Sequence, residues 1–525
     1  MFMNRRTAIK TLAASVPAFS IARALAADQP GGPPEIMAGP FDGTAESLKA
    51  YQVPEWFRDA KFGIWAHWGP QSAAEDGDWY ARHMYIQGEP QYQHHLERFG
   101  HPSKFGHKDL CKLWTADQFD PDHLMELYRK AGARYFMSMG VHHDNFDLWD
   151  SKHQPRWNSV AMGPKKDIVG LFKRAAQKQG LKFAVSEHLA WSYVWWPVSH
   201  GSDKTGPLAG VPYDGADPQY ADLYHEYAKE FLVPEQNNQP THLPAPLAWR
   251  QHYFDRLKDL IDKYEPDLLY NDGGMVFPEV HYRLVSHLYN VSAKAHGGKV
   301  EAVYTSKGRK DSETGTCVYD IERGVADQIL ANPWQTDTCI GAWHYDRGIL
   351  QNRSYKTPKR VVDMLVDIVS RNGNLMLNFP LPNSGALDDQ ELKVLAGITA
   401  WMGVNSEGIH ASRPWKIFGD GPGTKPAAAT DLRFNESKLQ DLSADDVRFT
   451  TKGDTLYAFV MGWPGKEAVI PSLATTARPG VGKIQNVELL GAGKVPFTQD
   501  QAALTVRLPE KQPCEHAITL KINGA

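Results

Sequence analysis

The stretch Leu268-Leu269-Tyr270-Asn271-Asp272-Gly273-Gly274 follows a helical pattern at residues 249–264 and decides the fold. A short apolar run between a helix and a glycine-rich turn is typical of a buried strand. Similar strand-type runs occur at residues 62–68, 135–141, 183–186, 300–304 and 375–377, and further helical patterns at residues 123–131, 168–178 and 360–370. Repeated strand–helix units predict a parallel sheet covered by helices. Across residues 48–418 they favour an α/β fold of the (β/α) TIM-like barrel type over a doubly wound sheet.

The segments on either side of this barrel have a different character. Residues 1–26 combine Arg5 and Arg6 with a short apolar stretch and the small residues Ala24-Leu25-Ala26, which predicts a twin-arginine signal peptide and a periplasmic or secreted protein. Glycine and proline predict a flexible lead-in at residues 27–47 and a linker at residues 419–435. Short, partly alternating runs at residues 436–525 predict a C-terminal antiparallel β-sandwich.

Composition excludes several classes of partner. Removal of residues 1–26 takes away four basic residues and no acidic one, so the net charge changes from −4 to −8. A mildly acidic body repels phosphate backbones, which argues against nucleic-acid binding. No later stretch is apolar enough for a membrane span, so we expect no membrane association after signal removal. The four cysteines are not spaced as a metal clip, and the sequence indicates no cofactor.

Titratable side chains follow the predicted strands where each strand ends. They are His67, His142, His143, Asp144, Glu187, His188 and Asp272. Because the carboxyl ends of barrel strands meet at one mouth, we expect these groups to form one polar site. No His-Glu-x-x-His helix supports a metal, and no Gly-x-Ser-x-Gly turn supports a serine nucleophile. Paired carboxylates remain, and two of them suffice to hydrolyse a glycosidic bond.

Asp272 is the first candidate for that pair. It leaves a buried strand and enters a glycine-rich turn, where a substrate can approach the backbone closely. The alternative interpretation is an ordinary turn-forming Asp before glycine.

Several segments, in order along the chain, resemble the family 29 α-L-fucosidases. The segments are Trp56-Phe57-Arg58-Asp59-Ala60-Lys61-Phe62-Gly63-Ile64-Trp65-Ala66-His67-Trp68-Gly69, His142-His143-Asp144-Asn145-Phe146, residues 266–273, Arg371-Asn372-Gly373-Asn374-Leu375-Met376-Leu377-Asn378 and Gly408-Ile409-His410-Ala411-Ser412-Arg413-Pro414-Trp415. The similarity continues into the C-terminal region at residues 450–458 and covers most of residues 48–525.

The resemblance implies a retaining exo-α-L-fucosidase that acts on a fucosylated oligosaccharide or glycoconjugate. Asp272 would be the nucleophile. The acid/base would be Glu322, on a loop at residues 318–324, with Glu187 as the rival. The implied substrate-binding residues are His67, Asp78, Trp79, His142, His143, Glu187 and Tyr270.

Three departures from the family leave the sugar preference open. Glu187 stands where many relatives carry Tyr or His. Asp78 stands where relatives usually carry Glu, and either Lys307 or Arg309 takes the place of a family arginine. The alternatives are therefore a hydrolase of another L-sugar, such as an α-L-galactoside, and a non-catalytic glycan-binding protein. Trp191, Trp195 and Trp196 form a hypothetical platform for the leaving group. The oligomeric state stays open and includes a homo-oligomer.

Overall fold

The computed structural model of the 525-residue chain describes residues 34–228, 232, 245–425, 432–478 and 480–524. The predicted signal peptide, residues 1–26, lies outside the described residues. Within these ranges no helix is both long enough and apolar enough to cross a membrane.

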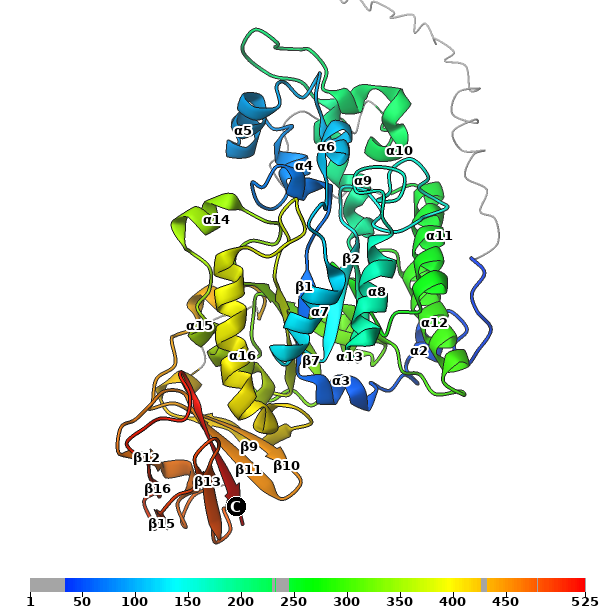
Figure 1. The fold of residues 1–525 in the computed structure, drawn as a ribbon. Coiled ribbons are helices and arrows are strands. Elements are labelled where there is room, and N and C mark those ends of the chain that lie inside the picture. Colours follow the sequence, from blue (N-terminus) through cyan, green and yellow to red (C-terminus); the bar gives the residue numbers. More distant parts are fainter. Residues whose placement is uncertain (1–33, 229–231, 233–244, 426–431, 479, 525) are drawn as a thin grey trace, which may run out of the picture.

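Eight parallel strands close into a barrel, as predicted (Figure 1). They are β1 Phe62–Ala66, β2 Tyr135–Val141, β3 Lys182–Glu187, β4 Leu268–Asn271, β5 Val303–Ser306, β6 Val318–Glu322, β7 Trp334–Cys339 and β8 Gly373–Asn378. Each strand pairs with its sequence neighbour, and β1 closes the barrel by pairing with β8, with Ile64 opposite Leu377. Nearly every strand residue is buried, as in a barrel covered by helices.

Helices cover the outside of the barrel. The longer ones are α7 Pro121–Lys130, α8 Ile168–Lys178, α11 Leu247–Tyr264, α12 Pro278–Ala295, α15 Pro358–Ser370 and α16 Asp389–Ile409. Sequence signals set their starts: the Thr357 hydroxyl accepts from the Arg360 amide at α15, and Asp388 and Glu391 form a capping box at α16. In α15 the residues from Val361 to Ser370 are all buried.

Short helices gather over the carboxyl ends of the strands, at the upper end of the molecule in Figure 1. They include η1 Pro70–Ala73, α4 Tyr80–His83, α5 Pro90–Arg98, α6 His107–Leu113, η2 Leu189–Trp191, α9 Ser192–Trp195, η3 Trp196–His200 and α10 Ala221–Tyr224, while α13 Arg309–Glu313 follows β5 and α14 Arg347–Asn352 follows β7. At the opposite end, α2 Ala45–Leu48 and α3 Glu55–Ala60 precede β1.

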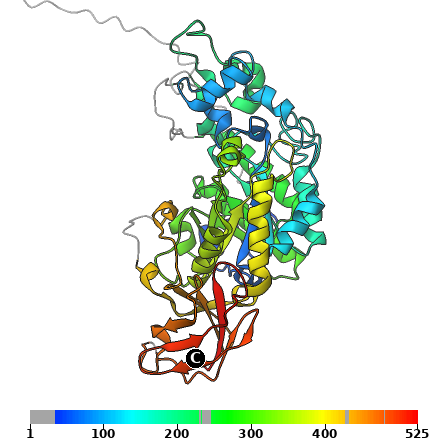
Figure 2. The same cartoon turned by 60° about the vertical axis from the view of Figure 1, so that its left-hand side comes forward.

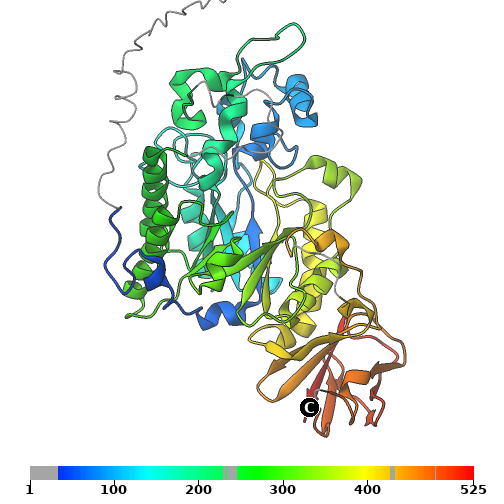
Figure 3. The same cartoon turned by 180° about the vertical axis from the view of Figure 1, so that it is seen from behind.

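The C-terminal part forms two antiparallel sheets, which confirms the second predicted domain. Its strands are β9 Arg413–Asp420, β10 Val447–Lys452, β11 Thr455–Val460, β12 Glu467–Ile470, β13 Asn486–Leu489, β14 Gly493–Lys494, β15 Phe497–Gln499, β16 Leu504–Arg507 and β17 Ile518–Asn523. The six-stranded sheet has the order β14-β13-β17-β11-β10-β9, and the other has the order β12-β16-β15. The domain lies at the end of the molecule away from the mouth (Figure 3).

The structure differs from the sequence prediction at the end of the barrel and in the lead-in. β9 pairs with β10 in the C-terminal sheet, so residues 413–418 belong to that sheet and not to the barrel. The lead-in is ordered where it is described, because α12 satisfies its backbone: the Met37 amide donates to His287 Nδ1 and the Phe41 amide to Asn290 Oδ1. The Phe41 ring also contacts Tyr289 edge-on, and a buried aromatic anchor holds the segment against the helix.

The two domains are joined through α15 and α16 (Figure 2). Arg448 of β10 is fully buried and donates to Asp367 of α15, which also accepts from Arg371. The Trp401 indole N–H of α16 donates to the Ala517 carbonyl over 2.8 Å. Buried, paired groups of this kind indicate a fixed contact and not a hinged one.

Candidate active site

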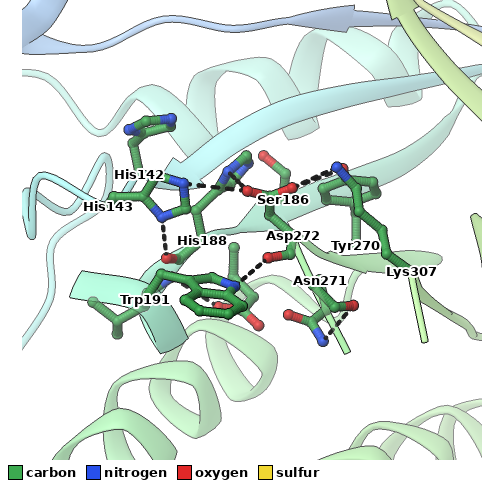
Figure 4. A network of polar contacts seen from close by, with 12 residues as sticks. His142, His143, Ser186, His188, Trp191, Tyr270, Asn271, Asp272 and Lys307 are labelled. Carbon is green, nitrogen blue, oxygen red and sulfur yellow. Dashed lines mark hydrogen bonds and ion pairs between the residues drawn. The ribbon is translucent and has the colours of Figure 1, made fainter. Parts of the chain in front are cut away.

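The Asp272 carboxylate lies at the centre of a cluster of cationic and imidazole groups, directly after β4 (Figure 4). Its Oδ2 lies 3.2 Å from His143 Nε2 and 3.0 Å from His188 Nδ1, and its Oδ1 lies 2.6 Å from Lys307 Nζ. About a fifth of the Asp272 side chain is exposed, so it stays open to a ligand. The backbone after β4 therefore delivers the carboxylate to the mouth, as the sequence predicted.

The turn after Asp272 requires glycine for a different reason than expected. Gly273 has φ +149°, and a Cβ there would lie 2.7 Å from the Trp191 indole nitrogen. That indole N–H donates to the Asp272 carbonyl over 2.8 Å. The close approach at Gly273 is thus made by Trp191, which fixes the backbone of Asp272.

Lys307 connects Asp272 to Glu322. Its Nζ, at the carboxyl end of β5, lies 2.6 Å from Asp272 Oδ1 and 2.6 Å from Glu322 Oε2. These two carboxylate oxygens are therefore at most about 5.2 Å apart, close to the roughly 5–5.5 Å between the carboxyl groups of retaining glycosidases. Arg309, the other candidate for the family arginine, is 68% exposed and pairs with Glu313.

Glu322 is the last residue of β6, not part of a loop as predicted. It lies opposite Asp337 of β7, and its backbone carbonyl accepts from the Phe434 amide over 2.8 Å. Burial raises the pKa of Glu322 to about 7, and the negative charges of Asp337 and Asp272 add to this effect. Together they outweigh the ammonium of Lys307, which lowers the pKa.

The pKa of Asp272 is lowered and the pKa of Lys307 is raised, so both groups stay charged. Burial raises the pKa of Asp272, but Lys307, His188 and the hydrogen bonds from the imidazoles outweigh it, and the pKa lies well below the usual range. Burial lowers the pKa of Lys307, but Asp272, Asp337 and Glu322 raise it well above its ordinary value. One carboxyl group is therefore ionised and the other can hold a proton near neutral pH, a division typical of glycosidases.

Tyr270 and Asp337 support this pair from inside the barrel. The Tyr270 hydroxyl donates to Asp337 Oδ2 over 2.7 Å and lies 3.3 Å from Asp272 Oδ1. The Tyr270 ring is completely buried and contacts Trp65 at 4.8 Å between centroids. Although it was predicted to bind substrate, Tyr270 lies beneath Asp272 and positions its carboxylate.

The predicted histidines gather beside Asp272. Gln71 Nε2 lies 2.9 Å from His142 Nδ1, and since Gln71 Oε1 accepts from the Ala81 amide, the amide nitrogen donates to the imidazole. His142 Nε2 then carries the proton and can donate to a ligand. His143 Nδ1 lies 2.8 Å from the His188 carbonyl and donates to it, which directs His143 Nε2 toward Asp272.

His67 directly follows β1, and its amide donates to Asn378 Oδ1 at the end of β8. Its ring lies edge-on to His188, with centroids 5.2 Å apart. Burial, with a smaller effect from His344 and His188, lowers the pKa of His67 well below its ordinary value. A neutral imidazole can both donate to and accept from a sugar hydroxyl.

Asp78 and Trp79 lie at the rim of the cluster. Trp79 has φ +61°, which is rare for a bulky residue and points to a functional constraint. Its ring contacts Trp195 at 4.8 Å and His143 at 6.2 Å. Asp78 Oδ1 lies 2.8 Å from the Nδ1 of His344, a residue that the sequence analysis missed.

Glu187 does not join the site. Its side chain is completely buried, with Oε1 2.9 Å from the Tyr253 hydroxyl and Oε2 accepting from the Leu189 amide. Burial raises its pKa to about 8, although these hydrogen bonds oppose the shift. Glu187 thus supports the wall behind Asp272, so it is poorly placed to bind substrate or act as the acid.

The predicted tryptophan platform is wrong in part. Trp195 and Trp196 are completely buried and pack into the core behind the histidines, whereas Trp191 is half-buried beside Asp272. The structure also brings the strand-end His188, which the sequence analysis found, together with Asp337 and His344, which it did not single out. His188 follows Glu187 directly and was visible as a strand-end imidazole, while Asp337 lies inside β7 and His344 lies on a loop without a strand signal.

The imidazoles also meet the spacing of a metal site. The ligand atoms of His67, His142 and His344, and those of His142, His143 and His188, lie within 4.8 Å of one another. The hydrogen bond from Gln71 leaves His142 Nε2 protonated, however, and a metal ligand must present a lone pair. The donor pattern therefore fits a hydroxyl-bearing ligand better than a cation.

Comparisons with known proteins identify the family of this chain. The model of the alpha-L-fucosidase family matches residues 34–407, and that of the alpha-L-fucosidase C-terminal domain matches residues 440–523. Human tissue alpha-L-fucosidase is 26% identical over 524 residues, which is 94% of this chain and 98% of the human protein. Human plasma alpha-L-fucosidase is 25% identical over 513 residues and covers 94% of each chain.

A solved structure of Thermotoga maritima alpha-fucosidase in complex with fucose has the same fold, with a TM-score of 0.66, 24% identity, and 92% of this chain and 99% of that chain covered. The family match spans more than half of the sequence and includes every strand of the barrel. The chain is therefore a glycoside hydrolase that belongs to the alpha-L-fucosidase family.

Proposed function

We propose that the protein is a retaining exo-α-L-fucosidase that removes terminal α-L-fucose from a fucosylated oligosaccharide or glycoconjugate. Asp272 attacks the anomeric carbon, and Glu322 protonates the departing glycosidic oxygen. Glu322 then takes a proton from the water that releases the covalent glycosyl-enzyme.

The observation that carries this proposal is the position of Lys307. Its single ammonium lies 2.6 Å from an oxygen of Asp272 and 2.6 Å from an oxygen of Glu322. These two oxygens are at most about 5.2 Å apart, which fits the spacing of a retaining pair and is short of the roughly 6.5–9.5 Å between the carboxyl groups of an inverting pair. The geometry therefore supports direct attack by Asp272.

The two pKa shifts suit the two roles. The pKa of Asp272 is held well below its usual range, so the nucleophile is ionised at any working pH. A pKa of about 7 leaves Glu322 largely protonated in mildly acidic solution, and it can later act as a base. Breaking the bond moves the proton from Glu322 to the leaving group, so Glu322 becomes a carboxylate while Asp272 gives up its negative charge in the glycosyl ester.

The sugar assignment rests on the histidines and on the relatives. His67, His142 and His143 offer ring nitrogens at the mouth beside Asp272, and such groups bind hydroxyls at fixed positions. The relatives are named alpha-L-fucosidases, and one solved structure contains fucose. We further propose export by the twin-arginine signal of residues 1–26, which gives a periplasmic or secreted enzyme.

The test measures hydrolysis of para-nitrophenyl α-L-fucoside by wild type, Asp272→Gly and Glu322→Ala, with and without azide. We expect near-abolition by both changes. Azide should rescue Asp272→Gly with an inverted glycosyl azide and Glu322→Ala with a retained one.

Each other outcome rejects one part of the proposed function. A wild type that turns over L-galactosides but not fucosides rejects the sugar. A wild type that binds fucose without turnover identifies a glycan-binding protein. Near-normal activity of Glu322→Ala on a substrate with a poor leaving group rejects Glu322 as the acid.

A further inference from the structure

His344 lies inside the histidine cluster, on the loop between β7 and α14. It is 1% exposed, and its ring lies edge-on to His67 and His142, with centroids 5.1 Å and 4.7 Å away. Asn378 fixes this loop, because its amide nitrogen donates to the Trp343 carbonyl while its oxygen accepts from the His67 amide. One side chain thus holds His67 and the His344 loop in register.

Asp78 determines which nitrogen of His344 carries the proton. Asp78 Oδ1 lies 2.8 Å from His344 Nδ1, and a carboxylate accepts only, so Nδ1 donates. In the neutral ring Nε2 then presents a lone pair. A carboxylate that orients an imidazole in this way is a common device for fixing its tautomer.

The Nε2 atom of His344 is buried and has no hydrogen-bond partner among the described residues. A buried acceptor without a partner costs about 1–3 kcal/mol, and beside the sugar site a hydroxyl of a bound ligand can satisfy it. The ligand nitrogens of His67, His142 and His344 lie within 4.8 Å of one another, so a single small polar molecule can touch all three.

We propose that His344 is a sugar-binding residue, whose Nε2 accepts a hydrogen bond from a hydroxyl of the bound sugar, and that Asp78 is the positioning residue behind it. This inference rests on the proposed function, because it assigns a further contact within the same sugar site. Asp78 is one methylene shorter than glutamate, and the imidazole extends its reach into the site. The Asp78–His344 pair, and not Asp78 alone, then sets the preference for one hydroxyl.

The experiment compares kcat/KM of an aryl α-L-fucoside with that of its 2-deoxy, 3-deoxy and 4-deoxy analogues. It uses wild type, His344→Ala and His344→Phe, with the exposed His123→Ala as control. His344→Phe keeps the ring packed against its neighbours and removes both nitrogens, so its activity is informative if His344→Ala fails to fold.

In wild type, loss of the hydroxyl that His344 binds should lower kcat/KM about 10-fold or more, since a hydrogen bond of about 1.4 kcal/mol corresponds to that factor. In both His344 variants, kcat/KM for that one analogue should lie within about twofold of kcat/KM for the parent fucoside. The losses for the other two analogues should persist. His123→Ala should behave as wild type.

Asp78→Glu combined with His344→Ala provides a second, independent readout. The longer carboxylate reaches the space that the imidazole leaves, so this double variant should recover activity relative to His344→Ala alone, and Asp78→Glu alone should not improve on wild type.

Persistence of all three deoxy losses in both His344 variants would overturn the proposal and make His344 a packing residue. Lack of recovery in the double variant would reject the role of Asp78. A wild type inert on every fucoside would instead reject the proposed function.

Discussion

Replacement of Lys307 by methionine gives the sharpest test of how the carboxylates share their charges. Lys307 Nζ contacts Asp272 and Glu322 at 2.6 Å each and lies 3.6 Å from Asp337. Methionine keeps much of the side-chain length but removes the ammonium that opposes burial at Glu322. The pKa of both Asp272 and Glu322 must therefore rise.

The size of the change follows from the contacts. An opposite charge within about 4–6 Å typically moves a carboxyl pKa by about 1–3 units. The pKa of Glu322, about 7 in wild type, should therefore rise to roughly 8–10. Glu322 acts in its protonated form, so activity is present below its pKa and is lost as pH rises through it; the alkaline limb should move up by the same amount.

The assay is the pH dependence of kcat/KM on a fucosyl disaccharide, whose leaving group needs protonation. Lys307→Arg is the matched control: it keeps the charge, so its alkaline limb should stay near that of wild type. Removing a partner of a buried pair costs about 3–5 kcal/mol, so thermal unfolding is measured alongside. An alkaline limb that stays in place or moves down in a folded Lys307→Met would refute the electrostatic role of Lys307.

Two further predictions concern residues behind the site. Glu187→Gln should keep near-normal activity, and its stability relative to wild type should increase as pH rises from about 4.5 toward 8, by an amount on the order of 3–5 kcal/mol. The reason is that the pKa of Glu187, about 8 when folded, exceeds its unfolded value, so wild type loses stability over that window and the neutral amide does not. Thermal unfolding against pH checks this, and a loss of activity comparable to that of Glu322→Ala would contradict it. Arg448→Met should lower the free energy of unfolding by about 3–5 kcal/mol, because it removes a buried partner of Asp367 between the domains, with kcat/KM of the folded protein at 25 °C within about twofold of wild type. An unchanged unfolding temperature would argue against a fixed contact.

The sequence predicted the architecture because the barrel repeats one unit. Runs at residues 62–68 and 135–141 are apolar, the second lies between helical patterns, and the structure places β1 and β2 there. Boundaries were less visible. The sequence assigns residues 413–418 to the end of the barrel because the predicted linker begins at residue 419. Pairing with β10 places them in the C-terminal sheet instead, and strand pairing is not a local property of the sequence.

Asp272 and the strand-end histidines could be found from the sequence because they directly follow apolar strands. Lys307 was ambiguous beside Arg309, since both follow β5, and only the exposure of Arg309 on α13 separates them. His344 lies on a loop, and a loop residue carries no periodic signal that places it near His67. Glu187 looked like a site residue because strand-end position alone cannot say whether a carboxylate faces the mouth or the wall.

The strands β6 and β7 were missed for a reason that explains the site itself. Inside a barrel, alternate residues of a strand face the axis, and in these two strands the axial positions carry Asp320 and Glu322, and Gln335 and Asp337. Gln335 donates to Asp320, and Asp337 accepts from Tyr270, so the polar groups satisfy one another instead of water. The pattern still has a period of two, but it is polar toward the interior, and a search for apolar runs rejects it. The polar residues that form the site thus remove the apolar pattern by which β6 and β7 would be recognised as strands. In this barrel, a polar residue at every second position between two apolar strands therefore indicates the catalytic strands.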